Sequence, residues 1–137
     1  MQGLSIPDDF PLDAFVGQEV SQLRIGVGQV ELSFYRPLPH TDPSRWEPGG
    51  RIDIEAGFIL QVPGSEEQIV RPPRFPKDSG VLTVQLQDLV SSIERLKGNE
   101  LQLKFSSGVS LRLLTDPQGY ESYHLHAAGD SVDVTKP

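Results

Sequence analysis

Short stretches in which apolar and polar residues alternate recur along this chain, and they constrain its fold more than any other feature. Residues 30–34, 51–55, 101–105 and 109–113 each follow this period of two. Because successive side chains of a strand point to opposite faces, we expect antiparallel strands with one face on a core and the other in water. Ser106-Ser107-Gly108 lies between the last two stretches, and its glycine suits a hairpin turn. The sequence therefore predicts a mainly β fold.

The two halves of the chain carry their apolar residues in a similar order. With small gaps, the first half contributes Leu12, Phe15, Val16, Val20, Leu23, Val30, Leu32, Phe34, Ile52, Ile54 and residues 58–60, and the second half contributes Leu86, Leu89, Val90, Ile93, Leu96, Leu101, Leu103, Phe105, Val109, Leu111 and residues 123–125. Each half would then be an antiparallel β-meander, and the two would pack as a sandwich or a partly open barrel with one or two short helices. We expect a single β-rich domain over residues 1–137, with repeat-like halves at about 12–70 and 80–135. The alternative is coincidence, because any two alternating sequences can be slid into register.

One stretch has helical rather than alternating spacing. The apolar residues that recur there at intervals of three and four are Leu82, Leu86, Leu89, Val90, Ile93 and Leu96. On a helix these residues would share one face, so the spacing predicts a helix over residues 84–96. A strand over residues 93–97 that follows a short helical turn is the alternative.

Acidic residues outnumber basic ones, which limits the partners of the protein. The chain has 19 Asp and Glu against 12 Lys and Arg, a formal net charge of -7 and a pI of about 4.8. Such a charge repels phosphate groups, so we expect no binding to nucleic acids or to anionic membranes. A basic protein partner is compatible with it.

The absence of cysteine removes several kinds of chemistry. A chain with no cysteine has no disulfide, no thiolate nucleophile and no cysteine-ligated zinc. Its first residues lack the basic and apolar segments of a signal peptide, and no apolar run reaches the ~20 residues that span a bilayer. We therefore expect a cytoplasmic protein that is not inserted in a membrane.

A pattern in the C-terminal half is similar to one found in other proteins. It consists of L-x-L-x-F-x-x-G over residues 101–108, followed by Leu111, Asp116-Pro117 and Tyr120-Glu121-Ser122-Tyr123, and it is preceded near the N-terminus by Val16-Gly17-x-x-Val20. These residues resemble an uncharacterised bacterial family of small domains with the pattern L-x-L-x-F-x-D-G and then Y-E-x-W. Ser107 stands where the family has an acidic residue, and Tyr123 stands where it has tryptophan. The resemblance implies a shared fold and lends no catalytic residue.

The strongest chemical signal is a pair of histidines near the C-terminus. Residues two apart on a strand share a face, so His124 and His126 would project together from the sheet. Their neighbours Tyr123 and Leu125 would face the core. Metal sites use such a His-x-His pair with a third ligand from a neighbouring strand, and the candidates for that ligand are His40, Asp53 and Glu55. The alternative is that both histidines are ordinary surface residues.

No catalytic or cofactor-binding signature stands out. The serines lack a G-x-S-x-G elbow, and Gly26-Val27-Gly28 lacks the third glycine and the helix of a dinucleotide site. A hydrolytic carboxylate pair could use Asp53 and Glu55, or Glu121. We expect the first two to face water instead, because they alternate with apolar isoleucines. We therefore assign no catalytic residue, no cofactor and no enzymatic activity.

A proline-rich insertion at residues 35–49 interrupts the repeat. It carries the only tryptophan, Trp46, together with Tyr35 and Arg45, and these residue types dominate protein interfaces. Alternatively, Trp46 covers an open end of the core. The insertion and the acidity favour a small protein-binding module, such as an inhibitor, immunity or regulatory protein that acts on a basic partner.

Two further functions compete with protein binding. A small-ligand or metal-binding β domain would use the face that carries His124 and His126. A homo-oligomer would be joined through its edge strands. The sequence leaves the oligomeric state open.

Overall fold

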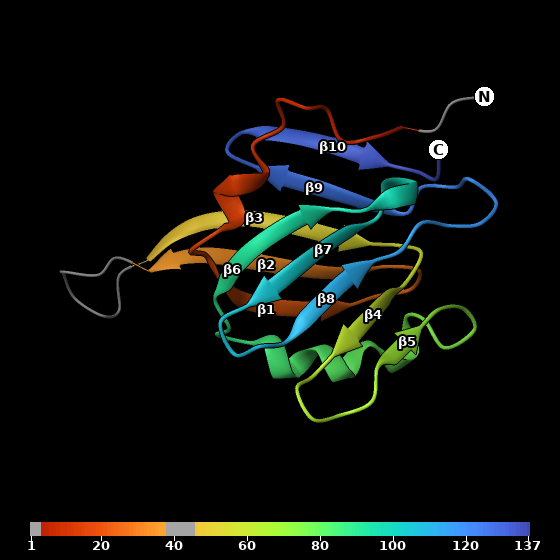
Figure 1. Ribbon diagram of the computed structural model, residues 1–137, viewed down its shortest axis with the longest axis horizontal. Helices are drawn as coiled ribbons and strands as arrows, with labels where there is room; N and C mark the ends of the chain where they lie inside the picture. Colours follow the sequence, from red (N-terminus) through yellow and green to blue (C-terminus); the bar gives the residue numbers. More distant parts are fainter. Residues whose placement is uncertain (1–3, 38–45) are drawn as a thin grey trace.

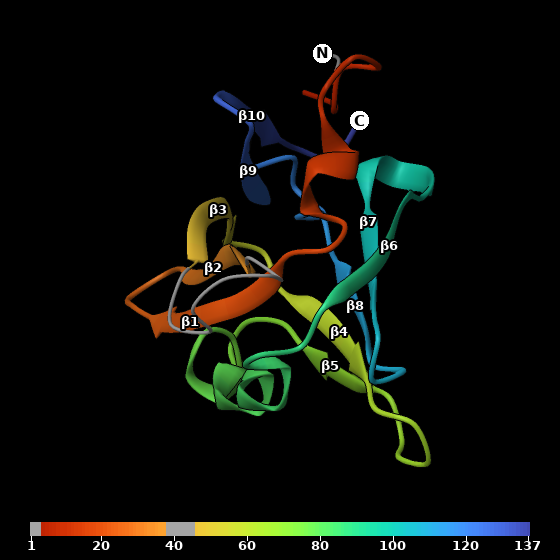
Figure 2. The same cartoon turned by 90° about the vertical axis from the view of Figure 1, so that its left-hand side faces the viewer.

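In the described part of the chain, ten strands form two antiparallel sheets that face each other (Figures 1 and 2). The computed structural model describes residues 4–37 and 46–137, apart from the side chain of Trp46. Sheet A has the strand order β1-β2-β3-β9-β10, and sheet B has the order β5-β4-β8-β7-β6. The strands are β1 (Glu19–Ile25), β2 (Val30–Pro37), β3 (Trp46–Ile54), β4 (Phe58–Gln61), β5 (Gln68–Val70), β6 (Val90–Arg95), β7 (Leu101–Phe105), β8 (Ser110–Leu113), β9 (Tyr123–Ala127) and β10 (Asp130–Val134). Over the described residues the sheets do not close into a barrel, and the predicted mainly β fold, a sandwich or partly open barrel, is confirmed.

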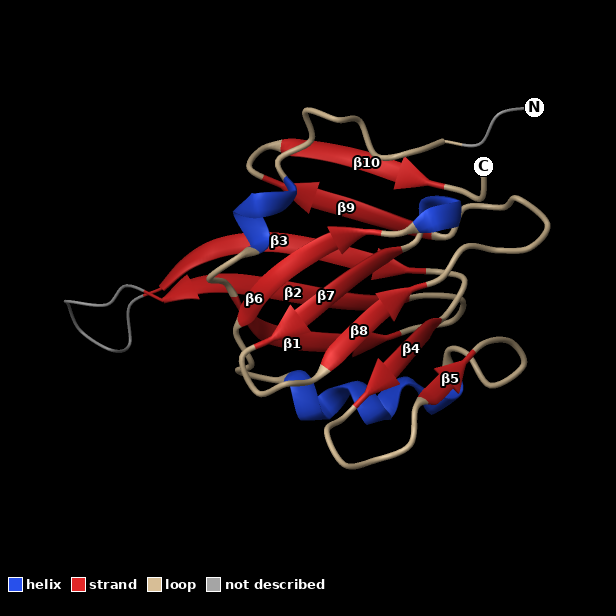
Figure 3. Cartoon of the chain, viewed as in Figure 1, coloured by secondary structure: helices blue, strands red, loops and turns tan. Residues whose placement is uncertain are grey.

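Short 3-10 segments complete the described secondary structure (Figure 3). They are η1 (Leu12–Phe15), η2 (Lys77–Gln85) and η3 (Lys97–Asn99). The longest, η2, lies at one end of the sandwich and contacts β1 (Figure 1). No helical segment in the described part of the chain is long and apolar enough to cross a membrane.

Each half of the chain builds most of one sheet and completes the other. Strands β1–β3 of the first half lie in sheet A, whereas its last hairpin, β4–β5, lies in sheet B. The second half does the reverse, with β6–β8 in sheet B and β9–β10 in sheet A. The two halves thus share one strand plan in which the final hairpins are exchanged, an arrangement that the sequence did not predict. That the halves arose by duplication stays a prediction.

The exchange of hairpins begins at the connection between β3 and β4. Residues 55–57 carry the chain from sheet A to sheet B. Gly57 has a φ of +131°, and a Cβ atom at this position would lie 2.4 Å from the carbonyl oxygen of Val70. Glycine is needed here because it lacks that atom and adopts positive φ at little cost.

Both meanders begin with the same irregularity. The register of β1 with β2 shifts at Ser21, and the register of β6 with β7 shifts at Ser91. Each serine hydroxyl donates a hydrogen bond to a carbonyl of the neighbouring strand, at 3.1 Å for Ser21 to Ser33 and 3.0 Å for Ser91 to Lys104. Each meander therefore opens on a β-bulge stabilised by a serine.

The bulge explains why the helix predicted over residues 84–96 is wrong. The 3-10 segment η2 ends at Gln85, and Val90–Arg95 is strand β6. Across the bulge, Val90 and Ile93 both pair with inward-facing residues of β7 although they are three positions apart. The interval of three that suggested a helix is the interval across the bulge. The stretch is a strand, as the alternative had it, but it covers Val90–Arg95 and not residues 93–97.

Cross-strand partners also fix which residues of the two halves correspond. In the structure, Val20 and Leu23 correspond to Val90 and Ile93. The order of apolar residues in the two halves had instead aligned them with Ile93 and Leu96. Likewise Ile52 and Ile54 correspond to Leu111 and Leu113, two positions further along than predicted. The match of residues 58–60 with residues 123–125 is confirmed.

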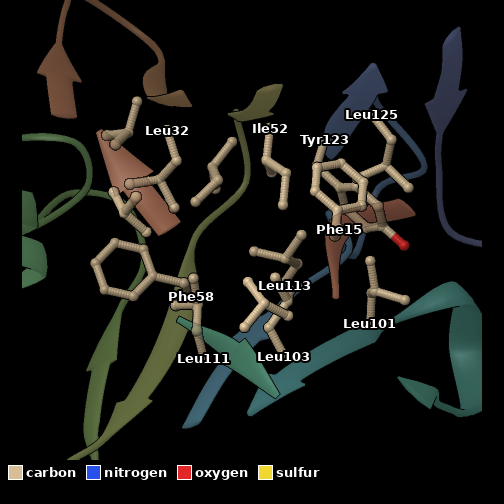
Figure 4. Packing of buried hydrophobic residues seen from close by; sticks show 14 of the residues in the cluster. Phe15, Leu32, Ile52, Phe58, Leu101, Leu103, Leu111, Leu113, Tyr123 and Leu125 are labelled. Atoms are coloured by element: carbon tan, nitrogen blue, oxygen red, sulfur yellow. The ribbon is translucent and has the colours of Figure 1, made fainter. Parts of the chain in front are cut away.

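One hydrophobic cluster fills the space between the sheets and takes residues from both halves (Figure 4). Its centre contains Phe15, Leu32, Ile52, Phe58, Leu101, Leu103, Leu111, Leu113, Tyr123 and Leu125. The Tyr123 ring is fully buried, and its hydroxyl donates a 2.7 Å hydrogen bond to the Asn99 carbonyl. This bond satisfies the one polar atom of the side chain.

The insertion at residues 35–49 is partly regular structure rather than a loop. Strand β2 runs to Pro37 and β3 begins at Trp46, so the two strands extend beyond the length of their counterparts β7 and β8. Residues 38–45 lie outside the described part. The predicted tight turn at Ser106-Ser107-Gly108 is confirmed, with Gly108 at a φ of +94°.

Candidate metal-binding site

Polar side chains cross the outer face of sheet A in two rows, each with one residue from every strand. The first row is Arg24, Glu31, Asp53, His124 and Asp133, and the second row is Gln22, Ser33, Arg51, His126 and Ser131. Tyr123 and Leu125 are fully buried on the inner face. The prediction that the two histidines project together from one face is therefore confirmed.

Three carboxylates surround the imidazole of His124. Its Nδ1 atom contacts the Asp133 carboxylate on β10. Its Nε2 atom lies 3.1 Å from Oε1 of Glu55 and 3.7 Å from Oε2 of Glu121. The His124 side chain is 15% exposed, whereas the Glu121 and Asp133 side chains are half-exposed. The imidazole is thus enclosed by protein while the carboxylates can be reached from water.

The carboxylates change the titration of His124. Burial of the ring lowers its pKa, but the hydrogen bond to Asp133 and the negative charges of Glu55 and Asp133 outweigh that effect, so the pKa of His124 is raised. One positive imidazolium then faces three carboxylates. The cluster keeps excess negative charge in either protonation state of His124.

Three side chains of this cluster are close enough to bind one metal ion. One ligand atom from each of Glu55, Glu121 and His124 lies within 4.8 Å of the other two. Asp133 contacts the other ring nitrogen, which is the arrangement by which carboxylates orient metal-binding histidines. One imidazole nitrogen and two carboxylate oxygens form a donor set that suits zinc, manganese or iron. We call Glu55, Glu121, His124 and Asp133 the His124 cluster.

His126 has different partners and is not part of the His124 cluster. Its Nε2 atom lies 3.0 Å from Nη2 of Arg51 and 3.3 Å from Oδ2 of Asp53. Arg51 and Asp53 therefore face the same ring nitrogen of His126, away from the His124 imidazole. Of the three expected third ligands, Glu55 joins the His124 cluster, Asp53 faces His126, and His40 lies outside the described residues.

The sequence did not predict two members of the His124 cluster, Glu121 and Asp133, as metal ligands, although a weak sequence signal exists for each. Glu121 precedes His124 by three residues and lies on the connection that leads into β9. Asp133 faces His124 because the turn at Ala128 and Gly129 pairs Ala127 with Asp130. Both turn residues have positive φ, which is typical of a two-residue hairpin. The dipeptide Ala-Gly predicts such a turn less strongly than Asn-Gly does.

Of the other predicted binding residues, Tyr35 lies away from the His124 cluster, and the side chains of Trp46 and Arg45 are outside the described part of the chain. Tyr35 is half-buried on β2, and its hydroxyl donates to the Glu19 carboxylate on β1. Trp46 begins β3, but its side chain is outside the described part, as is all of Arg45. The structure therefore does not bring Tyr35 together with the histidines, and the predictions for Trp46 and Arg45 concern side chains outside the described part.

The matching corner of sheet B provides an internal comparison. Register places Tyr123 in sheet A where Phe58 lies in sheet B. The positions that match His124, Asp133, Glu55 and Glu121 hold, in that order, Ile59, Ile69, Leu114 and Ala56. All four are apolar, so the shared strand plan does not require polar residues there. The His124 cluster belongs to one sheet only.

Comparisons with known proteins add no template for this site. No protein family, no curated protein and no solved structure matches the sequence.

Proposed function

We propose that this protein is a metal-binding β domain that holds a divalent transition-metal ion between Glu55, Glu121 and His124. The observation that carries the proposal is the geometry of the His124 cluster, in which three ligand atoms lie within 4.8 Å of one another. Asp133 supports it by holding the opposite ring nitrogen. The apolar residues at the matching corner of sheet B support a role beyond folding.

Charge balance on the outer face of sheet A favours a cation over an anion at the His124 cluster. Arg51 lies 3.5 Å from Glu31 and 3.1 Å from Asp53, and Arg24 lies 3.6 Å from Glu31. Those arginines offset the two carboxylates nearest to them. Among the described residues, the ion pairs of the His124 cluster carboxylates are with the imidazole alone, and a divalent ion would offset their remaining charge.

The donor set narrows the choice of metal. Magnesium and calcium favour oxygen ligands alone, whereas zinc binds imidazole nitrogen together with carboxylate oxygen. Three protein ligands leave one position of a tetrahedral zinc site for water. We propose ion binding without catalysis, and we take zinc as the probe.

Protein binding, the function that the sequence favoured most, stays a prediction. It depends on Trp46 and Arg45, whose side chains are not described. A cytoplasmic location and the inhibitor or regulatory role likewise stay predictions.

Calorimetric titration of the tag-free protein with zinc tests the proposal. We expect one ion per chain for the wild type and no saturable binding for His124→Ala. His126→Ala is the matched control, because it removes a histidine from the same strand without touching the His124 cluster, and it should bind as the wild type does. Absence of binding to the wild type, or equal losses in the two variants, would overturn the proposal.

A further inference from the structure

The two halves of the chain meet through surfaces of the kind that join separate subunits. Sheet A is joined across the halves by the pairing of β3 with β9, and sheet B by the pairing of β4 with β8. Both pairings lie in the middle of their sheets, over the common core (Figures 1 and 4). Neither half holds all the strands of any sheet.

The contacts between the halves are also reciprocal. The Val20 N–H donates to the Asp88 carbonyl at 3.2 Å. The N–H of Val90, which corresponds to Val20, donates to the Gln18 carbonyl at 2.9 Å. A contact that repeats when the two sides are interchanged is the mark of an isologous, twofold interface. The chain therefore has the architecture of a twofold dimer whose subunits are joined by a covalent connection.

Residues 71–89 form that connection, which we call the strap. Its η2 segment has 9 residues of 3-10 helix, longer than most such runs. Ser79 and Gln85 of η2 are fully buried, and their side-chain polar atoms have no hydrogen-bond partner among the described residues. Burying an unpaired polar group is unfavourable, so the closed strap carries a local cost that offsets part of the packing gained by its buried Phe75 and Leu82.

We propose that the strap is a hinge through which two copies of this chain exchange halves. In the exchanged dimer, the first half of each copy packs on the second half of the other. The pairings between the ten strands and the contacts between the two sheets are kept, whereas the strap gives up the core packing of Phe75 and Leu82 and its bridges to β1. Exchange of identical elements between two copies is a low-cost route to a dimer. An extended strap would span about 60 Å at roughly 3.3 Å per residue. A domain of this length has a radius of gyration of about 14 Å, so the strap can reach a second lobe.

Exchange would also share the His124 cluster between copies. Glu55 belongs to the first half, whereas Glu121, His124 and Asp133 belong to the second. Each cluster of the exchanged dimer would therefore combine residues of two chains. This consequence for metal binding rests on the proposed function, whereas the exchange itself does not.

An introduced pair of cysteines, one on each of two neighbouring strands, shows whether those strands belong to the same chain or to two different chains. Gln61 on β4 pairs with Ser110 on β8, so the two residues come from different halves and lie in the sheet without the His124 cluster. The natural chain has no cysteine, so Gln61→Cys/Ser110→Cys forms one defined crosslink. The matched control is Lys104→Cys/Ser110→Cys, whose residues pair within one half and crosslink within one chain in either form.

Each double variant is unfolded, refolded at a series of protein concentrations, oxidised, and run on a denaturing gel without reductant. We expect a covalent dimer for Gln61→Cys/Ser110→Cys and none for the control. At low conversion, a tenfold rise in concentration should raise the dimer-to-monomer ratio about tenfold by mass action. Crosslinked single chains at every concentration would overturn the exchange, even if light scattering showed that the native protein associates.

Metal binding then tests whether the His124 cluster is shared. Glu55→Gln and His124→Ala chains are refolded together, each being defective in binding zinc on its own. The exchanged heterodimer contains one intact cluster, so we expect saturable binding to return only after joint refolding. No recovery, with a wild type that binds zinc, would overturn sharing. A wild type that binds no zinc would refute only the proposed function, and the gel would still decide the exchange.

Discussion

Replacing Asp133 by asparagine separates orientation of His124 from stability of the fold. The carboxylate contacts Nδ1 of His124, and the amide oxygen of asparagine would replace that contact by a weaker, uncharged hydrogen bond. Nε2 of His124 would then be held less firmly toward Glu55 and Glu121. Removing a carboxylate that orients a metal-binding histidine lowers affinity about 10- to 100-fold. That loss equals roughly 1.4 to 2.7 kcal/mol of binding free energy. The Asp133 side chain is 51% exposed, so its contribution to folding should stay below about 1 kcal/mol.

The assay pairs a zinc titration with urea denaturation of the same Asp133→Asn protein. We expect the loss of binding free energy to exceed the loss of unfolding free energy. Asp130→Asn is the matched control, because Asp130 is an exposed carboxylate of the same strand outside the His124 cluster. Wild-type affinity in Asp133→Asn, or an equal loss in Asp130→Asn, would refute the orienting role.

Three further predictions concern pH, packing and the strap. Because the pKa of His124 is raised in the folded protein, protonation of His124 stabilises the fold fully below the ordinary histidine pKa of about 6.5, and this stabilisation is lost as pH rises through the raised pKa. In metal-free protein, His124→Gln should therefore reduce the dependence of the unfolding free energy on pH in that range. An unchanged dependence would contradict the assignment to His124. A Cβ at Gly50 would lie 2.5 Å from the Phe15 ring, so Gly50→Ala should cost about 1–3 kcal/mol in urea denaturation, while a neutral effect would show that the core yields there. Gln85→Leu removes a buried unpaired amide and should stabilise the fold by about 1–3 kcal/mol and lower the yield of exchanged dimer, whereas destabilisation would show that the amide has a partner.

The sequence contained enough to predict the strands that alternate strictly and the face of each of their residues, because both depend on local alternation. Residues 51–54 and 101–105 lie in strands as expected, although Glu55 lies just past the end of β3. His124 and His126 point outward as their spacing indicated. Alternation also matched residues 58–60 with residues 123–125, which occupy the equivalent positions of the second half. These inferences needed only the period of a strand.

Alternation carries no information about which strands become neighbours, and the remaining features depend on that. The exchange of hairpins follows from the short connection at residues 55–57, where Gly57 permits a close approach to Val70. Bulges at Ser21 and Ser91 shifted the period and so imitated a helix in the second half. Asp133 lies beside His124 because of the register of β9 with β10, and alternation within a strand does not determine that register.

Titration of isotope-labelled protein with Mn²⁺, followed by nuclear magnetic resonance, tests the metal site most directly. The paramagnetic ion broadens signals of nearby nuclei, and the matching corner of sheet B serves as an internal control. The account predicts that the amide signals of Glu55, Glu121 and His124 broaden first and that those of Ile59 and Leu114 stay sharp. Broadening that is equal at the two corners, or absent from His124, would contradict it.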